Sequence, residues 1–186
     1  MKSLQVLMAA VFLAAGTCVA SEVRNGQFAE GLKGWLILRD GSSSLGAQEA
    51  ATHCRFEDEG VIIDAQSIAG KATKPVGAVL SQYLGALQES GEYTLTFEVN
   101  IPAGEKVLYG LGMGIQGGPN KGNLGGGVVL TELVGTGEWV PVTASFRWDP
   151  SEAIANASDN NPGTPSLQFR IGLVKEFGIR NVSLSQ

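Results

Sequence analysis

The sequence has few of the residues on which catalytic and metal-binding sites most often depend. It contains one histidine, His53, and two cysteines, Cys18 and Cys54, among 186 residues. It has no Gly-x-Ser-x-Gly elbow, no histidine-rich metal set and no phosphate-binding loop. A glycosidase needs a pair of carboxylates, and no spacing pairs any two of the available acidic residues Asp64, Glu98, Glu132 and Asp149. These absences indicate a protein that is not an enzyme and needs no cofactor and no metal.

The sequence also lacks a hydrophobic run long enough to cross a bilayer, which takes about 20 residues. Its longest apolar run, residues 6–15, follows Lys2 and precedes the small-x-small site Cys18-Val19-Ala20. This pattern predicts a signal peptide over residues 1–20, cleaved near Ala20, and a secreted or periplasmic protein that is not membrane-embedded. Lipid attachment at Cys18 is disfavoured because Ala15 stands where lipoproteins usually have leucine.

The predicted mature chain, residues 21–186, has the length of a single domain. Its 12 basic and 18 acidic residues give a net charge of −6, which argues against nucleic acid as a partner. Cleavage leaves Cys54 as the only cysteine, so no internal disulfide can form. We expect Cys54 to be a small buried hydrophobe, with the neighbouring His53 on the opposite face of a strand.

Glycine makes up 25 of the 166 mature residues, and apolar residues recur with strand rather than helix periodicity. Nine strands are expected, at residues 35–39, 61–65, 78–84, 92–100, 106–116, 127–134, 139–148, 166–174 and 178–185. Strands of this number and spacing predict an all-β, two-sheet antiparallel β-sandwich of the jelly-roll type. Two long loops, at residues 117–126 and 149–165, were considered as binding edges.

Four sets of motifs follow one another along the chain. They are Asn25-Gly26-Gln27-Phe28 with Gly31-Leu32-Lys33-Gly34-Trp35, Leu80-Ser81-Gln82 with Gly91-Glu92-Tyr93-Thr94-Leu95-Thr96-Phe97, Gly137-Glu138-Trp139 leading to Phe146, and Ile179-Arg180-Asn181-Val182-Ser183-Leu184. In this order they resemble the motifs of carbohydrate-binding modules with the galactose-binding-domain-like jelly-roll fold. The resemblance implies the scaffold, with most motif aromatics in the core, and a noncatalytic glycan-binding role.

One position departs from that family pattern. Members of this fold often hold a structural calcium ion, with an aspartate in the closing strand among its ligands. Here the position is Arg180. An arginine cannot supply the oxygen ligands that calcium requires, so we expect no metal there and a pairing of Arg180 with a nearby acid.

Strand alternation places candidate ligand-binding side chains on outward faces. They are Tyr83, Gln116, Arg147, Gln168 and Arg170, with Trp148 as a second stacking candidate whose alternation with Phe146 favours burial. In residues 106–116, the alternation predicts core positions for Val107, Tyr109, Leu111, Met113 and Ile115. The opposite face carries Leu108, Gly110, Gly112, Gly114 and Gln116. The glycines indicate either a groove without side chains or a strand that curves sharply or is covered by its neighbours.

Three functions remain open at this point. The first is an exported glycan-binding module, with a polysaccharide or glycan as its partner. The second is a structural or protein-interaction domain of the cell envelope on the same scaffold, which the small number of exposed aromatics favours. The third, and weakest, is a polysaccharide lyase-like enzyme, for which the single His53 offers a poor base.

Overall fold

The computed structural model describes residues 23–39, 43–70, 76–84, 90–116, 126–149 and 165–186. These residues form eleven strands and two short helices. In chain order they are β1 (Leu36–Arg39), β2 (Ser43–Ser44), α1 (Ala47–Thr52), β3 (Cys54–Glu57), β4 (Gly60–Ile63), α2 (Ala65–Ala69), β5 (Val76–Tyr83), β6 (Gly91–Asn100), β7 (Leu108–Gln116), β8 (Gly126–Leu130), β9 (Val140–Trp148), β10 (Ser166–Leu173) and β11 (Phe177–Ser185).

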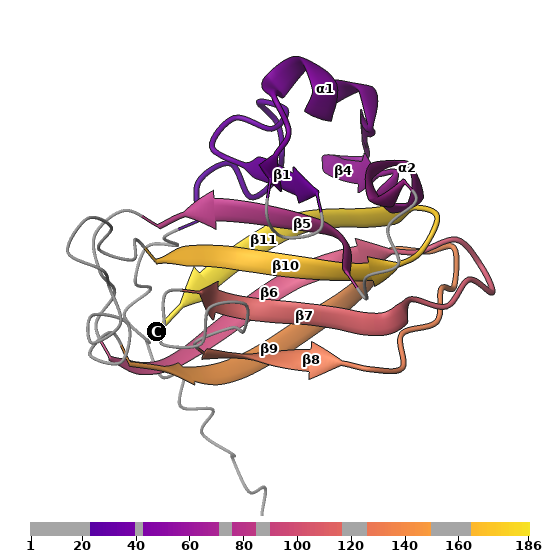
Figure 1. Ribbon diagram of the computed structural model, residues 1–186. Helices are drawn as coiled ribbons and strands as arrows, with labels where there is room; N and C mark the ends of the chain where they lie inside the picture. Colours follow the sequence, from indigo (N-terminus) through magenta and orange to yellow (C-terminus); the bar gives the residue numbers. More distant parts are fainter. Residues whose placement is uncertain (1–22, 40–42, 71–75, 85–89, 117–125, 150–164) are drawn as a thin grey trace, which may run out of the picture.

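The strands make two antiparallel sheets that pack face to face (Figure 1). The six-stranded sheet has the order β2-β1-β5-β10-β7-β8, and the five-stranded sheet has the order β3-β4-β11-β6-β9. Strands distant in sequence are neighbours in both sheets, as in a jelly roll. The predicted all-β sandwich is therefore confirmed, and all nine predicted strands are present.

The core lies between the sheets and follows the alternation of the strands. In β6, every second residue from Tyr93 to Val99 is at most 2% exposed, while the residues between them face outward. The Phe169 ring of β10 contacts Phe97 of β6 edge-on, with ring centroids 5.0 Å apart, and Trp35 at 6.2 Å. Aromatic contacts thus join the two sheets at the centre of the molecule.

The opening motif, which begins at Asn25, forms a compact loop, and the hydrogen bonds of this loop explain the asparagine. Asn25 has a left-handed φ of 50°, which asparagine tolerates better than most residues. Its side-chain Nδ2 donates to the carbonyl oxygens of Gly31 (2.9 Å) and Lys33 (3.1 Å), and its Oδ1 accepts from the amide of Glu30 (3.2 Å). The Asn25 carbonyl accepts from the indole Nε1 of Trp35 (3.1 Å). The loop therefore fixes the indole as it enters the core.

The Ser81-Gln82 motif on β5 also has a structural role. The Gln82 side chain is 1% exposed and bonds the backbone of Arg24 in both directions: the Arg24 amide donates to Oε1, and Nε2 donates to the Arg24 carbonyl, each at 2.7 Å. Gln82 therefore acts as a strand-like partner for the N-terminal segment. It satisfies two backbone groups that would otherwise be buried without partners.

Four short elements were not expected: β2, β3, α1 and α2. The prediction that His53 lies in a strand was wrong, because His53 ends α1, and its Nδ1 lies 3.0 Å from the Ser67 hydroxyl. Cys54 begins β3 and is half-buried against the core. Burial raises the pKa of the Cys54 thiol to about 12, so the thiolate that would act as a nucleophile is scarce near neutral pH.

Tyr109 was predicted to lie in the core, and that prediction was also wrong. Its side chain is 64% exposed, and its φ of 67° is unusual for an aromatic residue. The pairing of β7 with β10 shifts here between Leu111 and Leu108, which marks a β-bulge. The bulge interrupts the alternation of the strand and turns the tyrosine outward.

Within the described ranges, no helix is long and apolar enough to span a membrane. The same residues bring no three His, Cys, Asp or Glu side chains together as a metal site. The predicted signal peptide, residues 1–20, lies outside the described residues, and so does nearly all of the two long loops.

Candidate functional site

The outer face of the six-stranded sheet brings polar side chains from three strands into adjacent rows. Strand pairing aligns Ser81 of β5, Gln168 of β10 and Gly114 of β7 in one row. The next row towards one end holds Tyr83, Ser166 and Gln116, and the next towards the other end holds Val79, Arg170 and Gly112. The described side chains of these rows alternate with core residues, so they face away from the second sheet.

The central polar side chains are shielded from solvent despite facing outward. Ser81 is 4%, Ser166 is 6% and Gln168 is 7% exposed. The Gln168 Nε2 donates to the Ser166 hydroxyl at 3.3 Å. Hydroxyl and amide groups held in a buried position are suited to exchanging hydrogen bonds with ligand hydroxyls.

Arg170 follows Gln168 on the same face of β10 and is partly buried. Burial lowers the pKa of its guanidinium, although arginine remains charged in proteins. Tyr83, at the other end of the face, is 59% exposed and offers an aromatic ring to solvent. The face thus combines a ring, amide and hydroxyl groups, and one cation.

Two of the three glycines in β7 are explained by the neighbouring edge strand. A Cβ on Gly110 would lie 2.2 Å from the Leu130 carbonyl oxygen, and one on Gly114 would lie 2.1 Å from that of Gly126. Their φ angles, 76° and 151°, are also unfavourable for other residues. At these two positions the glycine is therefore required by the close approach of the neighbouring β8 backbone.

Three of the five predicted ligand-binding residues share this face, namely Tyr83, Gln168 and Arg170, while the backbone of the fourth, Gln116, pairs with Ser166 at the end of β7. Arg147 does not join them, because β9 belongs to the five-stranded sheet, where Arg147 pairs with Glu92 and is exposed on its outer face. Trp148 is fully buried and offers no stacking surface. Ser81 and Ser166 were missed, although their alternation along β5 and β10 could have indicated them.

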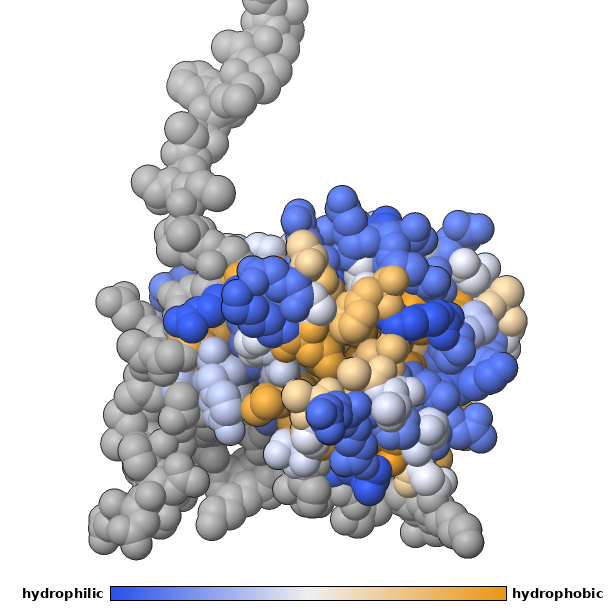
Figure 2. Space-filling view, turned by 90° about the horizontal axis from the view of Figure 1, so that it is seen from above, coloured by the Kyte–Doolittle hydropathy of each residue, from blue (hydrophilic) through white to orange (hydrophobic). Residues whose placement is uncertain are grey.

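A pocket apart from this sheet face lies beside α1, where the edges of the two sheets separate. Figure 2 looks down on this side and shows apolar side chains gathered within a hydrophilic surround. The pocket measures about 360 Å³, and its walls include Leu32, Leu36, Leu45 and Phe56. Lys33 is the one charged residue among the described residues that line it. Lys33 is paired with Glu30. This pocket lacks the hydrogen-bonding groups of the sheet face and is not the candidate site.

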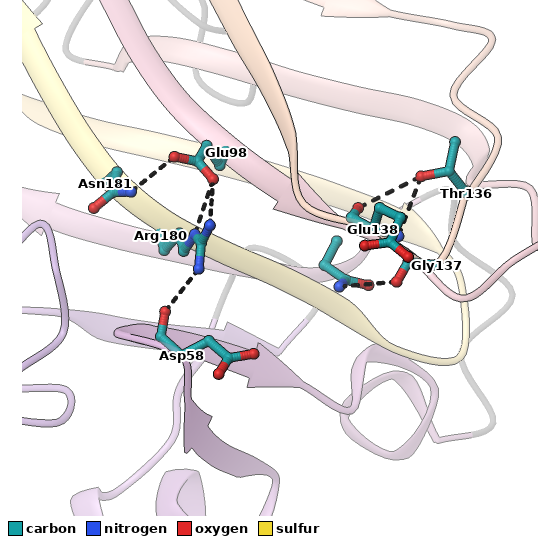
Figure 3. A network of polar contacts seen from close by, with 8 residues as sticks. Asp58, Glu98, Thr136, Gly137, Glu138, Arg180 and Asn181 are labelled. Atoms are coloured by element: carbon teal, nitrogen blue, oxygen red, sulfur yellow. Dashed lines mark hydrogen bonds and ion pairs between the residues drawn. The ribbon is translucent and has the colours of Figure 1, made fainter.

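Arg180 lies on the outer face of the five-stranded sheet, and its predicted pairing with an acid is confirmed (Figure 3). Its Nε and Nη2 donate to Glu98 Oε2 at 2.9 and 2.7 Å, and its Nη1 donates to the Asp58 carbonyl at 3.0 Å. Its guanidinium also lies 4.5 Å from the centre of the Trp139 ring. The arginine therefore links β11, β6 and the β3–β4 turn.

We expect Glu98 to make folding stability depend on acid pH. Hydrogen bonds from Asn181 and then Arg180 hold the pKa of Glu98 below its usual value of 4.5. Because the folded state favours the ionised form, this stabilisation is complete above that value and is lost as the pH falls through the lower, folded-state pKa. Thermal unfolding of Glu98→Gln from pH 7 to 3 should show a flatter decline than the wild type.

The matched control is Glu92→Gln, which removes an exposed acid from the same strand outside the network. An unchanged acid profile in Glu98→Gln, or an equal flattening in Glu92→Gln, would contradict the assignment.

No protein-family model matches the sequence, and no curated protein matches it. Solved structures do match the fold. The second N-terminal cellulose-binding domain of β-1,4-glucanase C from Cellulomonas fimi is 20% identical, with 89% of this chain and 94% of that domain covered and a TM-score of 0.55. A protein of Bacteroides thetaiotaomicron described as sugar-binding is 15% identical, with 90% and 100% covered and a TM-score of 0.55.

A Stig cyclase from Fischerella is 14% identical, with 86% of this chain and 92% of the cyclase covered and a TM-score of 0.53. At these identities the likeness establishes the fold, which is the jelly roll that the motifs predicted. The same scaffold carries both binding and enzymatic proteins, so function has to be argued from the site.

Proposed function

We propose that this protein, which has the jelly-roll fold of carbohydrate-binding modules, is a noncatalytic glycan-binding module. The observation that carries the proposal is the cluster of Ser81, Gln168 and Ser166 from two adjacent rows on the outer face of the six-stranded sheet, beside the exposed ring of Tyr83. Amide and hydroxyl groups exchange hydrogen bonds with sugar hydroxyls, and an aromatic ring packs against the apolar face of a sugar. Arg170 extends the same face.

Cellulose is the first glycan to test, because one matching structure is a cellulose-binding domain. We further propose that the protein acts after export, with residues 1–20 removed as a signal peptide. Mass determination of the protein recovered from the culture medium or periplasm should show a chain that begins at Ser21. Recovery of a chain that still carries residues 1–20 would contradict that part of the proposal.

A glycan array with purified residues 21–186 tests the binding function. We expect Gln168→Ala to weaken binding of the best glycan about ten-fold or more, because a buried hydrogen-bonding partner is lost. Tyr83→Ala should also weaken it, through the loss of ring contact. Isothermal titration calorimetry on each variant measures the change in Kd.

Arg147→Ala is the matched control, because it removes an exposed polar side chain from the other sheet, and its Kd should equal that of the wild type. An array without binding across plant, algal and bacterial glycans would overturn the proposal. It would favour the second candidate, a protein-interaction domain of the cell envelope, which is supported by the small number of exposed rings among the described side chains of this sheet, Tyr83 and Tyr109.

A further inference from the structure

The outer face of the six-stranded sheet continues into a cleft at the end opposite Tyr83. Beyond the row of Arg170 and Gly112, the strands pair Leu173 of β10 with Leu108 of β7. Both leucines line a cleft of about 430 Å³, whose other wall includes Gln66 of α2. Figure 1 shows α2 at the same end of the sheet as the start of β7 and the end of β10. The cleft therefore lies at the α2 end of the same sheet whose other end carries Tyr83.

The charges in this cleft differ in sign from those of the protein as a whole. The full chain carries a net charge of −5, yet the cleft contains two exposed lysines, Lys106 and Lys175. Within the part of the chain that the structure describes, neither ammonium group forms an ion pair. The carboxylate of Glu105, the one acid among the described residues that line the cleft, accepts a hydrogen bond from the backbone amide of Lys175 at 3.2 Å.

The described strands of this sheet place no acidic side chain on the outer face: they carry Leu36, Leu38, Val79, Ser81, Tyr83, Ser166, Gln168, Arg170 and Val129 there. A neutral ligand gains nothing from a cationic end. An anionic ligand gains Coulomb attraction to Lys106 and Lys175, which outnumber the Glu105 carboxylate among the described residues that line the cleft.

The cleft also offers apolar and amide contacts. Leu108 is 51% exposed, and together with Leu173 it provides an apolar surface for a ring face. The Gln66 amide can accept from and donate to hydroxyl groups. Two ammonium groups, an apolar floor and an amide match a sugar ring that bears both hydroxyls and an anionic substituent.

We infer that the cleft between α2, β7 and β10 is a subsite for a negatively charged sugar unit, so that the glycan bound along this face is an acidic polysaccharide. The inference rests on the proposed glycan-binding function and adds the charge class of the ligand. A carboxylate or a sulfate would supply the same negative charge, and the two are separated by experiment.

The test compares glycans that differ only in charge. Calorimetry measures binding of an oligogalacturonate and its fully methyl-esterified form, and of a carrageenan oligosaccharide and its desulfated form. We expect one charged form to bind about ten-fold more tightly than its neutral partner at low salt, with the preference shrinking as ionic strength rises. The pair that shows the preference identifies the anionic group.

Lys106→Gln with Lys175→Gln should abolish this preference, so that the Kd of the charged form equals that of its neutral partner in the same variant. Lys33→Gln is the matched control, because it removes a lysine beside α1 and should keep the preference. Equal binding of charged and neutral forms, or a preference that survives the double substitution, would overturn the inference and leave the proposed function intact.

A separate measurement covers the case in which none of these glycans binds, which would overturn the proposed function. Amide shifts are then recorded by NMR with free glucuronate, galactose 6-sulfate and glucose. Shifts at Gln66, Leu108 and Lys175 with an acidic sugar, and none with glucose, would support an anion subsite independently of any polysaccharide. No such shifts with either acidic sugar would overturn the inference as well.

Discussion

Replacing Phe169 by alanine is expected to lower the free energy of unfolding by about 3–5 kcal/mol, the usual range for a buried phenylalanine. Phe169 is fully buried, and its ring contacts Phe97 of the opposite sheet edge-on and Trp35 at the start of β1. The truncation leaves a cavity between the two sheets, and the hydrogen bonds between the strands of each sheet hold its backbone in place. Because the walls cannot collapse inward, most of the lost contact is not recovered.

Urea-induced unfolding followed by tryptophan fluorescence measures this change, since Trp35 reports directly on the site. Tyr83→Ala is the control: its ring is 59% exposed on the other face of the same sheet, and its removal should change stability by no more than about 0.5 kcal/mol. A loss below about 1 kcal/mol in Phe169→Ala would contradict the role of Phe169 as the contact that joins the sheets.

Gly114→Ala is expected to destabilise the protein by at least about 2 kcal/mol, from backbone strain and a steric clash. The φ of 151° at Gly114 is unfavourable for alanine, and the new Cβ would lie 2.1 Å from the carbonyl oxygen of Gly126. Moving β8 away gives little relief, because a Cβ on Gly126 would itself lie 2.3 Å from the Arg147 carbonyl of β9. The edge strand is thus confined between β7 and β9.

Hydrogen exchange should show β8 amides opening faster in Gly114→Ala, and chemical denaturation should show the loss of stability. The control is Gly46→Ala, since a Cβ there meets nothing within 4 Å. The same variant separates the two interpretations of the glycine-rich strand. If Gly114→Ala kept full stability and lost only glycan binding, the glycine would serve the ligand rather than the strand.

The sequence predicted the strands well because nearly all of them show the alternation that burial of one face imposes. It failed where the chain leaves that pattern. Tyr109 lies at a bulge whose positive φ reverses the expected side, and alternation carries no sign of such a change. The helices α1 and α2 span only 6 and 5 residues, too few for a helical period to emerge.

The candidate site was predictable in part for a related reason. The alternation of apolar and polar residues along a strand indicates which residues face outward. It does not indicate which sheet the strand belongs to, because sheet membership depends on pairing between strands that are distant in the sequence. Gln168 and Arg170 were therefore identified together on β10, whereas Arg147 was grouped with them although β9 lies in the other sheet. The cleft beside α2 depends on three separate segments, and no local pattern joins Gln66 to Lys106 and Lys175.

The strand order also has a consequence for how the chain folds. In each sheet a strand from the last part of the sequence occupies an interior position: β10 lies between β5 and β7, and β11 lies between β4 and β6. During synthesis, β5 and β7 emerge before β10, the strand that lies between them, and β4 and β6 emerge before β11. Both pairs therefore lack their shared neighbour until residues 166–185 have been made. Folding is therefore delayed until the chain is nearly complete, with high contact order and slow long-range pairing. A chain that completes its sheets this late is compatible with the export proposed above, because a translocation pore takes an unfolded chain.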